Sequence, residues 1–284
     1  MPSVLEIIQK SAEFLGSKGV ESPRLNAELL IGHALKLKRM QLYLQFERVL
    51  VESELELIRP LIKRRSQREP LQYIVGTVEF AGLKLKVDRR ALIPRPETEY
   101  LVEILVGQGA PAPRRVLDLG TGSGAIALAL AQAWPEAKVT AVDASSAALE
   151  LADENKTLTN MADRVDLVLS SWFEGLTTEN KFELIVSNPP YLSEKETTDA
   201  EPEVRNHEPK SALVAAEGGI GDLRSIVLAA PRFLTAGGLL ALETGITHHV
   251  ALVELARGSG FARVESRRDL TGRDRFLLAW MSCE

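Results

Sequence analysis

Apolar residues recur at helical spacing through the first quarter of the chain. Side chains three and four positions apart share one face of a helix, so each such run predicts a helix with one buried side. The predicted helices are 4–15, 25–34, 40–46 and 53–68. Residues 1–70 are therefore predicted to form a small helical bundle, the first of two domains.

The pattern changes to a period of two after Pro70. Apolar residues at 73, 75, 78 and 80 precede Ala81-Gly82, and apolar residues at 83, 85 and 87 follow it. Alternation on both sides of a short glycine turn predicts a β-hairpin. Residues 71–92 are therefore expected to be a hairpin linker.

From residue 115 onward, short apolar runs alternate with helical segments. Such alternation predicts βαβ units, hence a Rossmann-like α/β fold with a parallel sheet and helices on both faces, in a second domain of residues 93–284. The polar stretch 194–209 lacks periodicity and is expected to be a mobile loop over the site. The predicted strands are 116–119, 139–142, 165–169, 184–186, 239–243, 263–267 and 276–280. The predicted helices are 97–106, 125–133, 147–155, 222–234 and 249–257.

Composition narrows the class of protein. The 284 residues include one cysteine, Cys283, and four histidines without ligand spacing, so neither an internal disulfide nor a metal site is expected. No apolar run approaches the ~20 residues of a membrane span, and Glu6 and Lys10 interrupt any signal-peptide core. A cytoplasmic protein without membrane contact is predicted.

Charge is distributed unequally. Residues 1–92 carry 16 Lys and Arg against 11 Asp and Glu, while residues 93–284 carry 18 against 28, so the net charges are +5 and −10. An acidic second half argues against a large nucleic-acid footprint, because phosphates require a basic face. The basic run 63–68 fits either a solvated helix end or a surface that docks an acidic partner.

A glycine-rich turn follows the first predicted strand of the second domain. Gly120-Thr121-Gly122-Ser123-Gly124 lets a ligand approach the backbone, but its G-x-G-x-G spacing differs from the dinucleotide fingerprint. Asp143 ends the next strand and can accept hydrogen bonds from both hydroxyls of a ribose. Trp172 follows the third strand and can flank an adenine ring. Together these residues predict a site for an adenosine-containing ligand.

Asn188-Pro189-Pro190-Tyr191 follows a buried strand directly. The prolines end sheet pairing and stiffen the backbone, while the Asn188 amide, the backbone carbonyls and the Tyr191 ring suit a planar NH2 group. Taken alone, the four residues fit an Asn turn before a Pro-Pro loop equally well. The proline-stiffened stretch 92–99 likewise fits either a pocket wall or a linker with a helix cap.

With these motifs in order, the chain resembles the class I S-adenosylmethionine-dependent methyltransferases. Within them it is similar to the family that methylates N5 of a glutamine in peptide-chain release factors. The resemblance covers nearly the whole chain, and the combination of Pro-Arg-Pro-Glu-Thr with Asn-Pro-Pro-Tyr separates this family from most other methyltransferases. The stretches that carry it are 68–74, 92–99, 120–124, 188–191, 208–209 and 269–275.

The resemblance implies a division of labour. Residues 1–70 would dock a class 1 release factor, and the second domain would methylate the glutamine of its Gly-Gly-Gln motif, converting S-adenosyl-L-methionine to S-adenosyl-L-homocysteine. Gly120–Gly124, Asp143, Trp172 and Asn188 would line the cofactor. Asn188, Pro189, Pro190 and Tyr191 would bind the glutamine, with Asn188, Pro189 and Tyr191 as catalytic residues. A monomer that forms no stable complex with nucleic acid is expected.

Two other functions share these features. An adenine-N6 methyltransferase acting on DNA or RNA also handles a conjugated NH2 group, but the acidic second half disfavours it. A non-catalytic adaptor with a Rossmann-like core is disfavoured because the cofactor and acceptor motifs are both intact.

Overall fold

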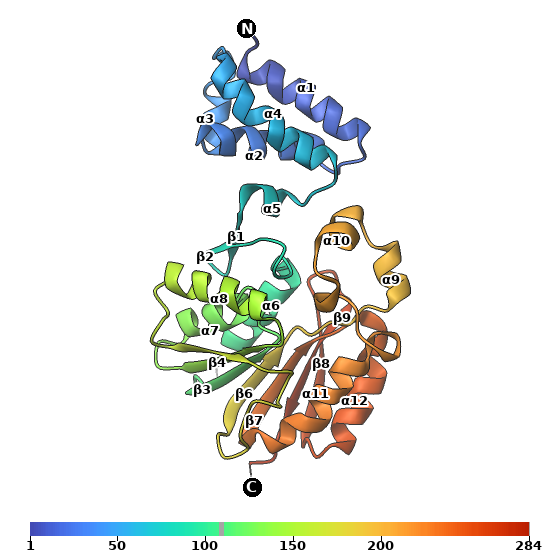
Figure 1. Cartoon of the computed structure of the whole chain (residues 1–284). Coiled ribbons are helices and arrows are strands. Elements are labelled where there is room, and N and C mark those ends of the chain that lie inside the picture. Colours follow the sequence, from blue (N-terminus) through green and yellow to red (C-terminus); the bar gives the residue numbers. More distant parts are fainter. Residues whose placement is uncertain (108–110, 284) are drawn as a thin grey trace. The chain divides into compact units, whose positions relative to one another are not determined.

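The computed structural model describes residues 1–107 and 111–283 and separates them into two compact units (Figure 1). The first unit comprises Met1–Thr77 together with a distant segment, Glu201–His207. The second unit contains the rest of the described chain. The chain thus leaves the second unit after Ala200, contributes seven residues to the first, and returns at Glu208.

The first unit is helical, as its apolar period predicted. Its first helix begins with a reciprocal cap, in which the Ser3 hydroxyl accepts from the Glu6 backbone N–H at 3.2 Å and the Glu6 carboxylate accepts from Ser3 N–H at 3.4 Å. Fully buried Ile8, Leu30 and Leu42 are part of one hydrophobic core. The helices are α1 (Val4–Ser17), α2 (Pro23–Leu35), α3 (Arg39–Tyr43), α4 (Glu52–Ser66), α5 (Leu71–Val75) and α10 (Pro202–His207).

The basic run at the end of α4 is paired within this unit. Arg65 contacts Glu203 at 2.8 Å, and Arg68 contacts Glu203 at 2.6 Å and Glu201 at 3.0 Å. Arg64 binds both oxygens of Glu69, at 2.8 and 2.7 Å. Since these guanidinium groups already have carboxylate partners, much of the positive charge of 63–68 holds α10 and the end of α4 in place.

The predicted hairpin linker is shorter than expected. Residues 71–75, assigned to a strand from their alternation, form helix α5, which begins after Pro70 and ends at Gly76 with a φ of +80°. A five-residue helix is too short to show its own period. The hairpin itself is confirmed: β1 (Thr77–Phe80) and β2 (Leu83–Lys86) are joined at Ala81-Gly82, where both φ angles are positive as in a type I′ turn.

The second unit is organised around a seven-stranded sheet of order β5-β4-β3-β6-β7-β9-β8. The first five strands in that order are parallel, and β9 and β8 add antiparallel strands at one side. The predicted Rossmann-like sheet is therefore confirmed. The strands are β3 (Arg115–Leu119), β4 (Lys138–Asp143), β5 (Val165–Leu169), β6 (Phe182–Ser187), β7 (Leu234–Glu243), β8 (Arg263–Arg268) and β9 (Asp274–Trp280).

Each face of the sheet carries its own hydrophobic core. Val116 packs into the cluster that contains α6 and α7, while its neighbour Leu117 packs into the cluster that contains α11 and α12. Successive residues of a strand point to opposite faces, so a strand of continuous apolar residues requires helices on both sides. The helices are α6 (Pro96–Val106), α7 (Ala125–Ala133), α8 (Ser146–Leu158), α9 (Glu194–Asp199), α11 (Gly221–Ala229) and α12 (His249–Gly258).

The stretch 194–209 differs from the irregular loop expected. It contains α9 and α10, and α9 begins with a cap in which Glu196 N–H donates to the Ser193 hydroxyl at 3.2 Å. Both helices are six residues long and polar, so they have no apolar stripe for a period to reveal. The predicted mobility of this stretch stays a prediction.

The strand order reverses at β3, which pairs with β4 on one side and with β6 on the other. Open α/β sheets bind ligands outside the carboxyl ends of the strands at such a reversal. The glycine turn follows β3, Asp143 ends β4 and Asn188 follows β6. The topology thus brings the predicted site residues to one edge of the sheet.

Candidate functional site

A pocket of about 370 Å³ lies at this edge of the second unit. Its lining includes the glycine turn, Asp143, Trp172 and Asn188, contributed by the ends of four strands. Pockets of ~300–1,000 Å³ with a few placed polar groups are the usual size for small ligands and cofactors. The pocket is therefore large enough for a bound cofactor.

The floor of the pocket is backbone. Gly120 and Thr121 both donate to the Val142 carbonyl, at 2.8 and 2.9 Å, and Gly120 has a φ of +69°. A methyl group on Gly120 would lie 3.4 Å from Cζ3 of Trp172. The positive φ therefore favours glycine at this position, and a side chain there would be in van der Waals contact with the indole ring.

Asp143 holds the turn in place. Its Oδ2 accepts from Gly122 N–H at 2.8 Å, and its Oδ1 accepts from Ser145 N–H at 2.8 Å. A carboxylate has about four lone-pair positions, so both oxygens keep capacity for a ligand. Asp143 thus both fixes the glycine turn and presents acceptors to the pocket it lines.

Trp172 adopts an uncommon backbone conformation. Its φ is +44°, in a region that non-glycine residues seldom occupy. Trp172 and Asp222 both line the pocket. Burial raises the pKa of Asp222, and the neighbouring Trp172 side chain opposes that shift. The indole ring thus lies beside a carboxyl group at the pocket.

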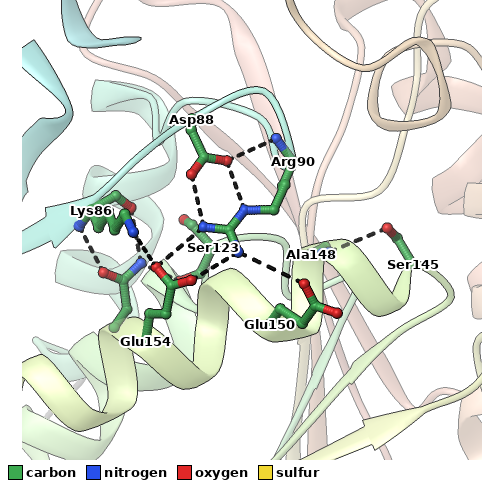
Figure 2. A network of polar contacts seen from close by, with 9 residues as sticks. Lys86, Asp88, Arg90, Ser123, Ser145, Ala148, Glu150 and Glu154 are labelled. Atoms are coloured by element: carbon green, nitrogen blue, oxygen red, sulfur yellow. Dashed lines mark hydrogen bonds and ion pairs between the residues drawn. The ribbon is translucent and has the colours of Figure 1, made fainter. Parts of the chain in front are cut away.

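The loop between β2 and α6 forms another wall and is tied to α8 by charge. The Arg90 guanidinium lies between Asp88 and Glu154, with contacts of 2.9 and 2.8 Å to Asp88 and of 2.9 Å to Glu154 Oε1 (Figure 2). The Arg90 hydrogen bond lowers the pKa of Asp88 and, with help from Lys86, lowers that of Glu154 to about 2. Arg90 and Ala91 line the pocket, so these ion pairs fix its wall.

A second clamp joins the wall to the segment after α10. Arg95 Nη2 lies 2.7 Å from each oxygen of Glu208, whose side chain is almost fully buried. Burial raises the pKa of Glu208, and the Arg95 charge opposes that shift. The stretches 92–99 and 208–209, both part of the family resemblance, therefore meet in the fold.

Asn188 is tied to a buried carboxylate through a hydroxyl. Its Nδ2 donates to Thr98 Oγ1 at 3.0 Å, and Thr98 Oγ1 donates to Glu243 Oε2 at 2.6 Å. The Tyr191 hydroxyl donates to the other oxygen of Glu243 at 3.1 Å. Glu243 is 1% exposed, and burial raises its pKa.

Most of the predicted site residues meet at the pocket, but three occupy other places. Gly124 is the N-cap of α7, Pro189 is buried, and Tyr191 packs its ring against the core of α11 and α12 while its hydroxyl binds Glu243. That the Tyr191 ring offers a flat face to a planar NH2 group stays a prediction. The predicted residues that line the pocket are Gly120, Thr121, Gly122, Ser123, Asp143, Trp172, Asn188 and Pro190.

Sequence reasoning missed Glu243 and left Thr98 undecided between a wall and a cap. A signal for Glu243 was present, since an acidic residue ends the apolar run 239–242 and so falls at the carboxyl end of a buried strand. Thr98 gives no comparable signal, because its partner is 145 positions away.

In residues 1–107 and 111–283, no three His, Cys, Asp or Glu side chains are grouped so that they could hold a metal ion. Over the same ranges, no helix has both the length and the apolar content needed to cross a membrane.

Known protein families and relatives match both the helical part and the α/β part of the chain. A family model described as PrmC N-terminal domain matches residues 6–76, and one described as methyltransferase small domain matches residues 96–207. A release factor glutamine methyltransferase from Chlorobaculum tepidum is 42% identical over 97% of this chain and 96% of its own length. One from Vibrio cholerae serotype O1 is 41% identical over 100% of this chain and 99% of its own.

The chain belongs to the release factor glutamine methyltransferase family. A solved structure shows the methyltransferase fold independently: a 16S rRNA methyltransferase from T. thermophilus, in complex with AdoMet and guanosine, aligns with a TM-score of 0.54 at 22% identity, over 72% of this chain and 49% of that one. The class I methyltransferase sheet expected from the resemblance is thus confirmed.

Proposed function

We propose that this protein transfers a methyl group from S-adenosyl-L-methionine to N5 of the glutamine in the Gly-Gly-Gln motif of peptide-chain release factors. The observation that carries the proposal is the pairing of the Asn188 amide nitrogen with Thr98, because it leaves the amide oxygen for a substrate NH2 group beside the pocket. The names of the relatives, at about 40% identity over nearly the full chain, support the choice of substrate.

The residues present fit the cofactor. The glycine floor leaves room that a side chain at 120 would fill, and Asp143 has acceptor capacity for ribose hydroxyls. We assign Gly120–Gly124, Asp143, Trp172 and Asn188 to its binding. S-adenosylmethionine, when bound, supplies a methyl group activated by its sulfonium sulfur, and S-adenosylhomocysteine is the product.

The chain's own part in catalysis is positioning. An amide nitrogen is a weak nucleophile, because its lone pair is delocalised into the carbonyl. We assign one N–H group of the glutamine to the Asn188 amide oxygen and the other to the backbone carbonyl of Pro189, which lies between the pocket-lining residues Asn188 and Pro190. The two acceptors aim the glutamine nitrogen. Orientation of this kind can lower the activation free energy by up to ~7–11 kcal/mol. Both acceptors gain strength as positive charge develops on the nitrogen, so they favour the transition state. The proton then passes to water.

Tyr191 takes a supporting part in this proposal. With its hydroxyl on Glu243 and its ring in the core, it anchors the end of the Asn188–Tyr191 turn. Pro190 lines the pocket and limits the space open to the glutamine side chain.

The partner is a class 1 release factor, which we propose docks on the helical N-terminal unit. The net charge of −10 over residues 93–284 supports a protein substrate over nucleic acid. We place the protein in the cytoplasm, where its substrate acts in translation. That it works as a monomer remains a prediction for sedimentation analysis.

Radiolabelled cofactor tests the substrate. The protein is incubated with a release factor, with the same factor carrying glutamate in place of the Gly-Gly-Gln glutamine, and with a DNA duplex. Label is expected on the unmodified factor alone. Label on adenine of the duplex would support the adenine-N6 alternative, and label on the glutamate variant would place the methyl group elsewhere.

A further inference from the structure

We propose that Thr98 and Glu243 are positioning residues that determine which end of the Asn188 amide faces the pocket. The proposal rests on the proposed function, because it explains how Asn188 comes to present an acceptor. It concerns two nearly buried residues, since Glu243 is 1% and Thr98 4% exposed, and of the two only Thr98 also lines the pocket.

Hydrogen-bond polarity along the chain of contacts carries the argument. A carboxylate can only accept, and the two oxygens of Glu243 receive one hydroxyl each, from Thr98 and from Tyr191. A hydroxyl has a single hydrogen, and that of Thr98 is used at 2.6 Å on Glu243. Thr98 Oγ1 therefore has only lone pairs left for Asn188.

An Asn side chain has two chemically different ends. Only its NH2 group can pair with the lone pairs of Thr98, and the observed contact at 3.0 Å involves that nitrogen. A flipped amide would place two acceptors against each other. With the nitrogen thus engaged, Oδ1 is the end left for the pocket that Asn188 lines.

The polarity of Asn188 matters because the substrate NH2 group brings two N–H donors. An amide oxygen accepts one of them, whereas an amide nitrogen turned to the pocket would oppose donor to donor. The same carboxylate also holds Tyr191, three residues after Asn188, so both ends of the turn are fixed to one buried group. Burial raises the pKa of Glu243, and the Thr98 and Tyr191 hydroxyls oppose that shift together with the charge of Arg275, which lies 3.5 Å from the Tyr191 hydroxyl. The polarity described here belongs to the ionised form of Glu243.

Valine in place of threonine tests the hydroxyl at nearly constant shape. Thr98→Val is expected to lower kcat on a release factor ~100-fold, the scale of a small misplacement at a reacting centre, with little change in the KM for the cofactor. Thr98→Ser keeps the hydroxyl and should restore most of the turnover. Glu243→Gln should also lower kcat, because a glutamine NH2 group can donate to Thr98 and reverse the polarity.

Thr244→Val is the matched control. Thr244 is the next residue along the chain after Glu243, is fully buried, and binds His249 and the Arg275 carbonyl rather than Asn188. Thr244→Val should lower the free energy of unfolding about as much as Thr98→Val does, but it should leave kcat near the wild-type value. Equal kcat for Thr98→Val and Thr244→Val would overturn the proposal.

A second readout requires neither substrate nor cofactor. In protein labelled with 15N-asparagine, the side-chain NH2 resonances of Asn188 are identified from their loss in Asn188→Asp. Thr98→Val and Glu243→Gln are expected to shift these resonances and accelerate their exchange with water, whereas Thr244→Val is not. Resonances unchanged in both variants would overturn the positioning role, even if the wild-type protein proved to methylate another substrate. Absence of label on a release factor would overturn only the proposed function.

Discussion

Two buried carboxylates at strand ends support different parts of the pocket. Asp118 supports the cofactor half, formed by the glycine turn and Asp143, and Glu243 supports the acceptor half around Asn188. Asp118, near the end of β3, accepts the Thr121 hydroxyl at 2.6 Å, and Glu243, at the end of β7, accepts the Thr98 hydroxyl at the same distance. The first threonine lies three residues away in the chain and the second 145. One contact stiffens a local turn, and the other joins distant elements.

The two carboxylates also differ in how fully they are satisfied. Both oxygens of Glu243 receive hydroxyl donors. Oδ2 of Asp118 accepts from Thr121 and from the Ala127 N–H, but no residue in the described ranges donates to its Oδ1. A buried oxygen without a donor penalises the charged form. The cofactor half therefore depends on backbone contacts and on one acid with an unpaired buried oxygen, whereas the acceptor half depends on a carboxylate with a donor on each oxygen.

The largest effect is expected at the residue that the network serves. Asn188→Ala removes an acceptor that strengthens in the transition state, so single-turnover methylation should slow by ~10²–10³-fold, the usual effect of losing one preorganised partner. Binding of the release factor should change far less, because docking is assigned to the helical unit. A parallel loss of binding and turnover would make Asn188 a docking residue.

The pH dependence of the free energy of unfolding tests the role of Asp118 in the cofactor half. Burial raises its pKa from 3.8 to about 7. An acid whose pKa is higher in the folded than in the unfolded protein destabilises the fold once the pH exceeds its pKa in the unfolded chain. Relative to Asp118→Asn, the wild type should lose up to ~4 kcal/mol of stability as pH rises from 4 to 7.

Urea denaturation of both proteins across that pH range checks this prediction. The difference between them isolates Asp118 from the other buried acids, because Glu208, Asp222 and Glu243 are present in both and titrate alike. A difference that stays constant from pH 4 to 7 would mean that Oδ1 gains a donor in solution.

The same contrast explains what could be predicted from sequence. The glycine turn, Asp143 and the Asn188–Tyr191 turn are each contiguous or immediately follow a strand, so their order along the chain placed them at one edge of a parallel sheet. Hydrogen bonds within a turn, such as that from Thr121 to Asp118, join residues close in sequence and can therefore be inferred from the sequence.

The network around Glu243 could not be predicted in the same way. Its partners are 145 and 52 positions distant, and their meeting depends on how α6 packs beside β6 and β7. The bond from the Tyr191 hydroxyl to Glu243 was not predicted for that reason, and the role of its ring toward the substrate stays a prediction. The error at 71–75 has another cause, since a single helical turn between proline and glycine carries too few residues to show a period.

Asp143 offers an intermediate effect on the cofactor half. Asp143→Ala removes charged hydrogen bonds worth about 1.5–3 kcal/mol each, so the Kd for S-adenosylmethionine should rise roughly 10- to 150-fold for each bond lost to the ligand. Calorimetry measures this Kd directly. Because Asp143 also holds Gly122, the melting temperature should fall as well. An unchanged Kd would remove Asp143 from the site.

The smallest expected effect concerns the floor of the pocket, and the chain provides its own control. Gly120 and Gly260 both have positive φ, of +69° and +92°, but a methyl group on Gly260 meets nothing within 4 Å, whereas one on Gly120 meets Trp172 at 3.4 Å. Gly260→Ala should lose only the ~1–2 kcal/mol of a left-handed backbone. Gly120→Ala should cost a similar amount of stability, because its contact with Trp172 is an ordinary van der Waals contact, but it should weaken cofactor binding, because Gly120 lines the pocket and Gly260 does not. Urea denaturation and calorimetry of the pair separate the two effects, and an unchanged Kd for Gly120→Ala would show that the cofactor does not approach the backbone at Gly120.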